Sequence, residues 1–139
     1  MADVSGTKDW YLTYVRHRDM IERKIKSIED EGEKVIIRYK DKTLTAIIMP
    51  LINGVDALLS QLEGDKHITL VTLNNEKNLK TIIGQWEKVS KYKNFRIIFA
   101  NPNTHEKWMV CPYTHNRISE SPEKGLKSLF ETVEEVQKV

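Results

Sequence analysis

The residues best suited to chemistry gather in one segment near the carboxyl end of the chain, NPNTHEKWMVCPYTH at residues 101–115. Four of its side chains can serve as nucleophile, acid, base or metal ligand, namely His105, Cys111, Tyr113 and His115. A thiolate paired with an imidazole is a nucleophile, and the same two groups can bind zinc. One hypothesis is therefore a small enzyme whose site lies around Cys111 and His115.

Structural explanations compete with this hypothesis. A lone cysteine on an alternating strand is usually a small buried apolar residue, and Pro112 together with the strand pattern predicts extended chain from Cys111 to His115. With His105, these residues supply at most three zinc ligands. Cys111 is the only cysteine, which excludes an internal disulfide and a multi-cysteine zinc site within one chain. Because at most three ligands are on offer, we expect no metal. Loops of the GxxxxGK[ST] and GxGxxG types are absent from the sequence, so we expect no cofactor.

Basic residues point to a second kind of chemistry, which is binding to phosphate. They lie on the first predicted helix and near the ends of later strands, with Tyr92 and Tyr113 close enough to stack on bases. The set that we predict to bind nucleic acid is Arg16, Arg23, Lys24, Lys91, Lys107 and Arg117. Acidic residues are interleaved with them and the net charge is only +2, which is typical of a solvated face. Whether the six side chains converge depends on the fold.

Length and composition indicate one folded domain over residues 1–139, with residues 1–8 flexible. The chain is 40% hydrophobic and 30% charged, a balance that favours a packed core over disorder. The amino terminus lacks the charged start and apolar run of a secretion signal, and no apolar stretch approaches the ~20 residues that cross a bilayer. We therefore expect a soluble cytoplasmic protein without membrane contact. Abundant Lys, Glu and Ile would also suit a thermophile.

Hydrophobic periodicity predicts helices and strands along the whole chain. Amphipathic helices are expected at residues 9–30, at 55–62, from Asn74 through Val89, and from Ser121 through Val136. Strands are expected at residues 34–39, 43–49, 67–73, 95–100 and 107–111. The strands at 67–73 and 95–100 are rich in apolar residues, which predicts burial on both faces near the centre of the sheet.

These elements predict the order α-β-β-α-β-α-β-β-α and an α/β protein, with α+β as the alternative class. A right-handed crossover through the helix that starts at Asn74 makes its two flanking strands parallel neighbours. The first hairpin extends the sheet on one side, and the strand carrying Trp108 extends it on the other. The expected fold is a mixed sheet of about five strands with helices on both faces.

The expected order resembles the core of the restriction-endonuclease-like superfamily, the PD-(D/E)XK nucleases and their archaeal junction-cutting and tRNA-splicing relatives. That core reads helix, strand, strand, strand, helix, strand. The resemblance covers most of residues 9–112 through topology alone, with the helix at 55–62 as an insertion. It implies a metal held by an acidic residue near the second strand and by a (D/E)-x-K pair on the third.

The catalytic residues that the resemblance implies are missing from the expected strands. The second strand, TLTAIIM, has no acid, and the third, ITLVTL, has neither a carboxylate nor a lysine. Asp41, Asp56, Glu76 and Lys77 lie near these strands, which leaves a migrated site open. A nuclease-like fold would then imply a domain without cutting activity.

Our leading prediction is a non-enzymatic binding or scaffold module, in the form of a catalytically inactive nuclease-like domain within a nucleic-acid-processing assembly. The alternatives are the small enzyme around Cys111 and His115 and a homodimeric protein-interaction module. Such a dimer would pair through an exposed sheet edge or through the last helix. The expected partners are accordingly nucleic acid, a second copy of the chain or another protein.

Overall fold

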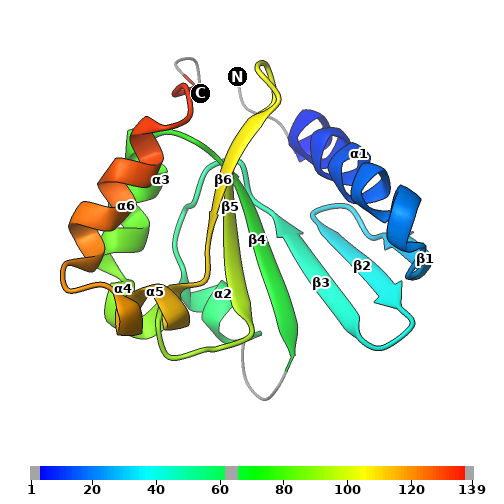
Figure 1. Cartoon of the computed structure of the whole chain (residues 1–139), viewed down its shortest axis with the longest axis horizontal. Coiled ribbons are helices and arrows are strands. Elements are labelled where there is room, and N and C mark those ends of the chain that lie inside the picture. Colours follow the sequence, from blue (N-terminus) through cyan, green and yellow to red (C-terminus); the bar gives the residue numbers. More distant parts are fainter. Residues whose placement is uncertain (1–3, 62–65, 137–139) are drawn as a thin grey trace.

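A mixed sheet of six strands forms the centre of the protein in the computed structural model, which describes residues 4–61 and 66–136 (Figure 1). The strands are β1 (Ile25–Asp30), β2 (Lys34–Tyr39), β3 (Thr43–Ile48), β4 (His67–Leu73), β5 (Phe95–Asn101) and β6 (Glu106–Val110). They lie side by side in chain order. β1, β2 and β3 form an antiparallel meander, β3, β4 and β5 run parallel, and β6 returns antiparallel to β5.

Helices connect and cover these strands. Within the described residues they are α1 (Val4–Glu22), α2 (Asp56–Leu59), α3 (Glu76–Gly84), α4 (Trp86–Val89), α5 (Pro112–Ile118) and α6 (Pro122–Glu131). The predicted α/β class is confirmed, but the predicted order was wrong: the observed order is α-β-β-β-α-β-α-α-β-β-α-α, with six strands instead of about five. None of the described helices has both the length and the apolar character that crossing a membrane requires.

The predicted helix at residues 9–30 was wrong in its last third, where the chain turns and forms β1. Arg23 adopts the left-handed region at φ 50° and donates its backbone N–H to the Asp19 carbonyl oxygen at 2.8 Å. The Asp19 carboxylate also accepts the backbone N–H of Lys24 at 2.7 Å. These contacts end α1 and turn the chain back toward the sheet.

A β-bulge explains why β1 has the spacing of a helix. Ile25 and Ile28 are three residues apart, and both pack against the same core. The register of β1 against β2 shifts between Ile25 and Ser27. Because a bulge inserts one extra residue into a strand, it brings both isoleucines onto one face. The i, i+3 pattern that predicted a helix therefore belongs to a bulged strand.

The segment from Cys111 to His115 was predicted to be extended, and this prediction was wrong. α5 begins directly after Cys111, and His115 donates its backbone N–H to the Cys111 carbonyl oxygen at 2.9 Å. Pro112 occupies the first turn of the helix, where its missing N–H costs no hydrogen bond. Proline thus starts a helix here instead of prolonging an extended segment.

Other helices differ from prediction in where they start or break. α3 and α4 were predicted as one helix, but the chain breaks at Gln85, directly after Gly84. α1 begins at Val4, so the first eight residues, which were predicted to be flexible, include a helical part with a buried Thr7. Residues 1–3 lie outside the described part of the chain.

Helices lie on both faces of the sheet (Figure 1). On one face, Trp10, Tyr11 and Val15 of α1 pack against a core formed by β2, β3, β4 and β5. On the other face, α2, α3, α4 and α6 share a core with the strands, in which Phe95 and Phe99 are fully buried. The described helices therefore cover the two faces unequally.

α1 leaves the β5–β6 side of its own face open. Its main contacts are with β3 and β4. Arg96 on β5 is exposed, and Met109 on β6 keeps 36% of its surface exposed. Both lie on the α1 face of the sheet, because Ile98 packs in the core on that face. Arg96 is two residues before Ile98 on the same strand, and Met109 pairs with Ile98 across the two strands, so all three side chains share one face. A depression is therefore left between α1 and the last two strands.

Candidate functional site

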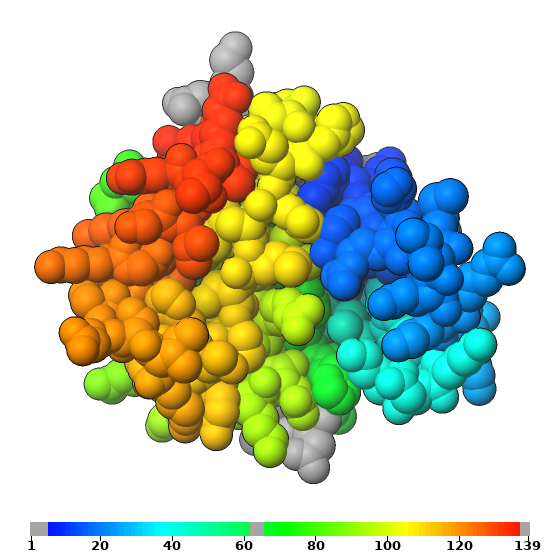
Figure 2. Space-filling model, viewed as in Figure 1, coloured from blue at the N-terminus to red at the C-terminus, as the bar shows by residue number. Residues whose placement is uncertain are grey.

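The depression beside α1 contains a hollow rich in cations. In Figure 2 the surface is hollowed between α1 in blue, the β2–β3 hairpin in cyan and β5 in yellow-green. Four basic residues help to line it, namely Arg18, Lys24, Lys42 and Arg96. Its volume is about 190 Å³, below the ~300–1,000 Å³ of typical small-molecule sites. The hollow therefore fits a phosphate group better than a bulky cofactor.

A second hollow lies along α1 between Gly6 and His17, where the β5–β6 turn approaches the helix. Its lining includes Trp10, Tyr14, His17, His105 and Lys107. Tyr14 lines both hollows, so they are neighbouring parts of one depression. We call the two hollows together the α1 groove.

Tyr14 holds two cations at the centre of the α1 groove. Its hydroxyl oxygen accepts a hydrogen bond from a guanidinium N–H of Arg18 at 3.0 Å. The ammonium of Lys107 lies 4.7 Å from the centre of the Tyr14 ring, within the range of a cation–π contact. Trp10 stacks parallel to this ring, with centres 5.6 Å apart. Tyr14 thus orients one cation from α1 and one from β6.

The protonation states of the groove preserve its positive charge. The hydrogen bond to Tyr14 raises the pKa of the Arg18 guanidinium above its usual value. Burial raises the pKa of Tyr11 and of Tyr39 above the usual value of a phenol. Both phenols therefore stay neutral at physiological pH. The ammonium of Lys42 lies 5.7 Å from the centre of the Tyr39 ring, so Tyr39 supports a cation as Tyr14 does.

The cations of the groove form no close ion pairs, although the charge of Glu22 acts on Arg18 from beyond ion-pair distance. Within the described residues, no carboxylate lies at ion-pair distance from the groove cations, which are Arg18, Lys24, Lys42, Arg96 and Lys107. Three acids line the groove near the end of α1, namely Asp19, Glu22 and Asp41. The Asp19 carboxylate is already hydrogen-bonded to backbone N–H groups. These three acids lower the positive field at that end of the groove, and Asp9 lowers it in the second hollow.

Two of the six basic residues predicted to bind nucleic acid lie in the α1 groove. They are Lys24, in the first hollow, and Lys107, in the second. Arg16 is exposed on α1, and Arg23 is exposed directly after it, but neither lines the groove. These two charges can add only to the field around it.

The other two predicted cations lie elsewhere. Lys91 is exposed in the turn between α4 and β5. Arg117 lies on α5, where its guanidinium sits 3.4 Å from the centre of the Tyr113 ring and donates to the Tyr113 carbonyl oxygen at 3.0 Å. The structure therefore does not gather the six predicted residues into one site.

The predicted set left out three cations of the groove, which are Arg18, Lys42 and Arg96. The strongest available signal was Arg96 in the strand FRIIFA. Arg96 is two residues before Ile98, so both side chains point to the same face of the sheet, which α1 covers only in part. A charged residue at a position of an apolar strand that should face the core indicates a gap in the layer that covers this face.

No family model, curated protein or solved structure matches this chain. The chemistry and geometry of its own residues are therefore the basis for inferring a function.

The Cys111 and His115 side chains have separate partners. The Cys111 thiol lies 3.6 Å from the Lys93 carbonyl oxygen. Nε2 of the His115 imidazole lies 3.1 Å from the Pro122 carbonyl oxygen. The imidazole ring also packs edge-to-face with the Trp86 ring, with ring centres 5.7 Å apart. No side-chain hydrogen bond joins the cysteine to the histidine in the described part of the chain.

The remaining members of the predicted enzyme site are also apart. His105 precedes β6 and lines the α1 groove, whereas Cys111 follows β6 at its other end. Tyr113 lies under the guanidinium of Arg117 on α5. Across residues 4–61 and 66–136, no three His, Cys, Asp or Glu side chains gather closely enough to hold a metal ion.

The carboxyl ends of the parallel strands, where α/β proteins often bind ligands, are covered by the chain itself. Asn74, directly after β4, donates from its side-chain amide to the Val133 carbonyl oxygen at 3.0 Å. Its backbone carbonyl oxygen accepts the Val136 backbone N–H at 2.9 Å. Asn101 at the end of β5 donates to the Glu134 carbonyl oxygen at 2.9 Å. The segment after α6 is thus tied across this edge.

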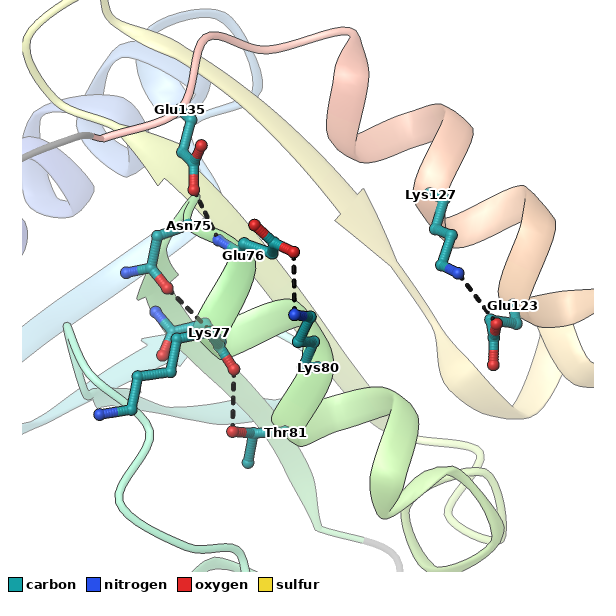
Figure 3. Close-up of polar contacts among 9 residues, drawn as sticks. Asn75, Glu76, Lys77, Lys80, Thr81, Glu123, Lys127 and Glu135 are labelled. Carbon is teal, nitrogen blue, oxygen red and sulfur yellow. Dashed lines mark hydrogen bonds and ion pairs between the residues drawn. The ribbon is translucent and has the colours of Figure 1, made fainter.

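The same segment also covers the start of α3 (Figure 3). The Glu135 carboxylate accepts the backbone N–H of Glu76 at 2.9 Å, which places a negative charge where a bound anion would otherwise lie. The Glu76 side chain pairs with Lys80 at 2.9 Å, while the Lys77 side chain extends away from both (Figure 3). Glu76 and Lys77, named above for a migrated catalytic site, therefore point in different directions.

Proposed function

We propose that this protein is a non-enzymatic module of the cytoplasm that binds nucleic acid along the α1 groove, mainly through the sugar–phosphate backbone. The observation that carries the proposal is the pair of cations held by Tyr14. Arg18 and Lys107 come from different elements, are oriented by one ring, and form no ion pair with a carboxylate of the described residues. Cations fixed in this way suit phosphate oxygens.

A polymer with repeated negative charges matches the groove better than a single anion does. The cations come from α1, from the β2–β3 hairpin, from β5 and from β6, so they are spread along the depression. Backbone contacts of this kind give affinity with little sequence preference and strong dependence on salt. With a net charge of only +2, the affinity should rest on the groove and not on a general positive field.

The order of the elements supports the further proposal of a catalytically inactive nuclease-like domain in a nucleic-acid-processing assembly. From α1 to β4 the chain runs helix, strand, strand, strand, helix, strand, the same order as the superfamily core named above. With β1 in place, α2 fills the position of that core's second helix and is no longer an insertion. β2 and β3, KVIIRY and TLTAII, contain no carboxylate, so the acids that would hold a catalytic metal are missing from both strands.

Fluorescence anisotropy with labelled single-stranded, duplex and branched DNA and with RNA tests this function. We expect binding to at least one of them that weakens steeply as salt rises, and no cleavage when Mg²⁺ is added. Affinity that does not respond to salt, or no binding to any of the four, would refute the proposal. Cleavage that depends on Mg²⁺ would refute its non-enzymatic part.

A further inference from the structure

The second hollow of the α1 groove differs in character from the first. Rings dominate its lining, from Trp10, Tyr14 and His17 on α1 and from His105 in the β5–β6 turn. The backbone of His105 lies in the left-handed region at φ 61°. Pro102 from the same turn completes the ring-rich wall. We call this hollow the ring pocket.

The ring pocket is large enough for a flat heterocycle. Its volume is about 440 Å³, inside the ~300–1,000 Å³ range of small-molecule sites. The exposed imidazoles of His17 and His105 and the ring of Pro102 favour stacking with a nucleobase, whereas Trp10 is largely buried against Tyr14. Lys107 lies at the boundary between the ring pocket and the rest of the groove, over the ring of Tyr14. A base in the pocket would therefore leave its phosphate beside a cation that is already in position.

Asp9 is the acidic residue of the ring pocket. Its side chain is exposed, and it has neither a hydrogen bond nor an ion pair with another described residue. An ionised carboxylate only accepts hydrogen bonds, through two oxygens that suit a pair of adjacent donors. Next to cations that attract phosphate, an unpaired acid opposes general binding. Its presence is better explained by contact with donors on a base.

We propose that the ring pocket binds a guanine base of the bound strand, with Asp9 accepting hydrogen bonds from the N1–H and the N2 amino group of guanine. This inference rests on the proposed function, because the base is delivered by a strand held along the α1 groove. It makes Asp9 a specificity-determining residue in a groove that otherwise contacts phosphate.

The other bases fit a carboxylate less well. On the edge that pairs in a duplex, adenine and cytosine each place a ring nitrogen acceptor next to their amino group, and uracil and thymine flank one N–H with two carbonyl oxygens. Each of these acceptors would face a carboxylate oxygen and repel it. Guanine alone among the five places two donors side by side. A single strand, or an unpaired base, is required because this edge is occupied in a duplex.

The test compares oligothymidylates that carry one central guanine, adenine or cytosine, measured by fluorescence anisotropy. We expect the guanine oligonucleotide to bind about tenfold more tightly than the others, in line with a bidentate contact. Asp9→Asn should equalise the guanine and adenine oligonucleotides while leaving binding to plain oligothymidylate equal or stronger. Glu87→Gln, on the exposed side of α4, makes the same charge change away from the groove and should keep the preference.

The outcomes separate this inference from the function on which it rests. Equal affinity for all oligonucleotides, with salt-dependent binding intact, would overturn the guanine pocket and leave the proposed function standing. A guanine preference that survives in Asp9→Asn would overturn the role of Asp9. If no oligonucleotide binds, the proposed function fails, and titration of GMP against AMP followed by NMR decides whether the pocket selects guanine by itself.

Discussion

Tyr14 organises cations and does not offer a free surface for stacking. Its ring already contacts Lys107 and Trp10, and its hydroxyl is bonded to Arg18. A base could stack there only by displacing one of them. Under the proposed function, affinity at the residue scale depends on how firmly Tyr14 fixes its two cations, and removal of the hydroxyl oxygen alone tests this.

Tyr14→Phe removes the hydroxyl that accepts the Arg18 hydrogen bond and keeps the ring under Lys107. We expect nucleic-acid affinity to fall about twofold to tenfold, since a net hydrogen bond contributes about 0.5–1.5 kcal/mol. Anisotropy titration measures the change, with Tyr113→Phe on α5 as the matched control. Equal affinities for the two variants would show that the hydroxyl does not help to bind.

Tyr11 allows a test of the groove's ionisation through stability. Because burial raises the pKa of Tyr11, the neutral phenol contributes stability that is fully present below the ordinary tyrosine pKa of about 10. That contribution is lost as pH rises above 10 toward the folded-state pKa. Urea unfolding at pH 8 and at pH 11 should therefore show a smaller loss of stability for Tyr11→Phe than for the wild type. An equal loss of stability in the variant and the wild type would contradict the raised pKa of Tyr11.

At the element scale, the sequence predicted those helices and strands whose hydrophobic residues recur at regular spacing. β4 and β5 were placed correctly as parallel neighbours, because apolar strands joined by a helix allow little else. β1 was missed because its bulge produces helical spacing, and α5 because Pro112 suits both a helix start and an extended segment. Arg96 indicated a gap in one covering layer, but the groove itself could not be predicted, because the strand pattern does not show which helix lies beside that gap.

Asn74 joins three elements, and its loss should be costly. Its side-chain oxygen accepts the Trp108 indole N–H at 2.7 Å, and its amide holds the segment after α6 through Val133. Asn74→Ala would leave a buried indole donor unpaired, so we expect the free energy of unfolding to fall by about 2–4 kcal/mol. Equilibrium urea denaturation measures it. A loss below about 0.5 kcal/mol would show that the segment contributes little.

At the scale of the whole molecule, the two faces of the sheet are covered to different extents. The face with α2, α3, α4 and α6 holds the larger core, and the segment after α6 closes the carboxyl ends of the parallel strands. The face with α1 is covered only in part and carries the groove. The segment at residues 101–115, which holds the cysteine and two histidines, is thus divided between two places. His105 lies in the groove, and His115 is packed between α4 and α6.

The most direct test of the account compares two double variants that remove equal charge. Arg18→Ala with Arg96→Ala empties the groove of two cations, whereas Lys91→Ala with Arg117→Ala removes two that lie outside it. The salt dependence of single-stranded DNA binding is then measured for both by anisotropy, after thermal unfolding has shown that both are folded. We predict that the slope of log K against log salt falls by about 1.4 for the groove variant, or ~0.7 for each lost phosphate contact, and stays unchanged for the other. Equal slopes for the two variants would contradict the central claim that nucleic acid binds in the α1 groove.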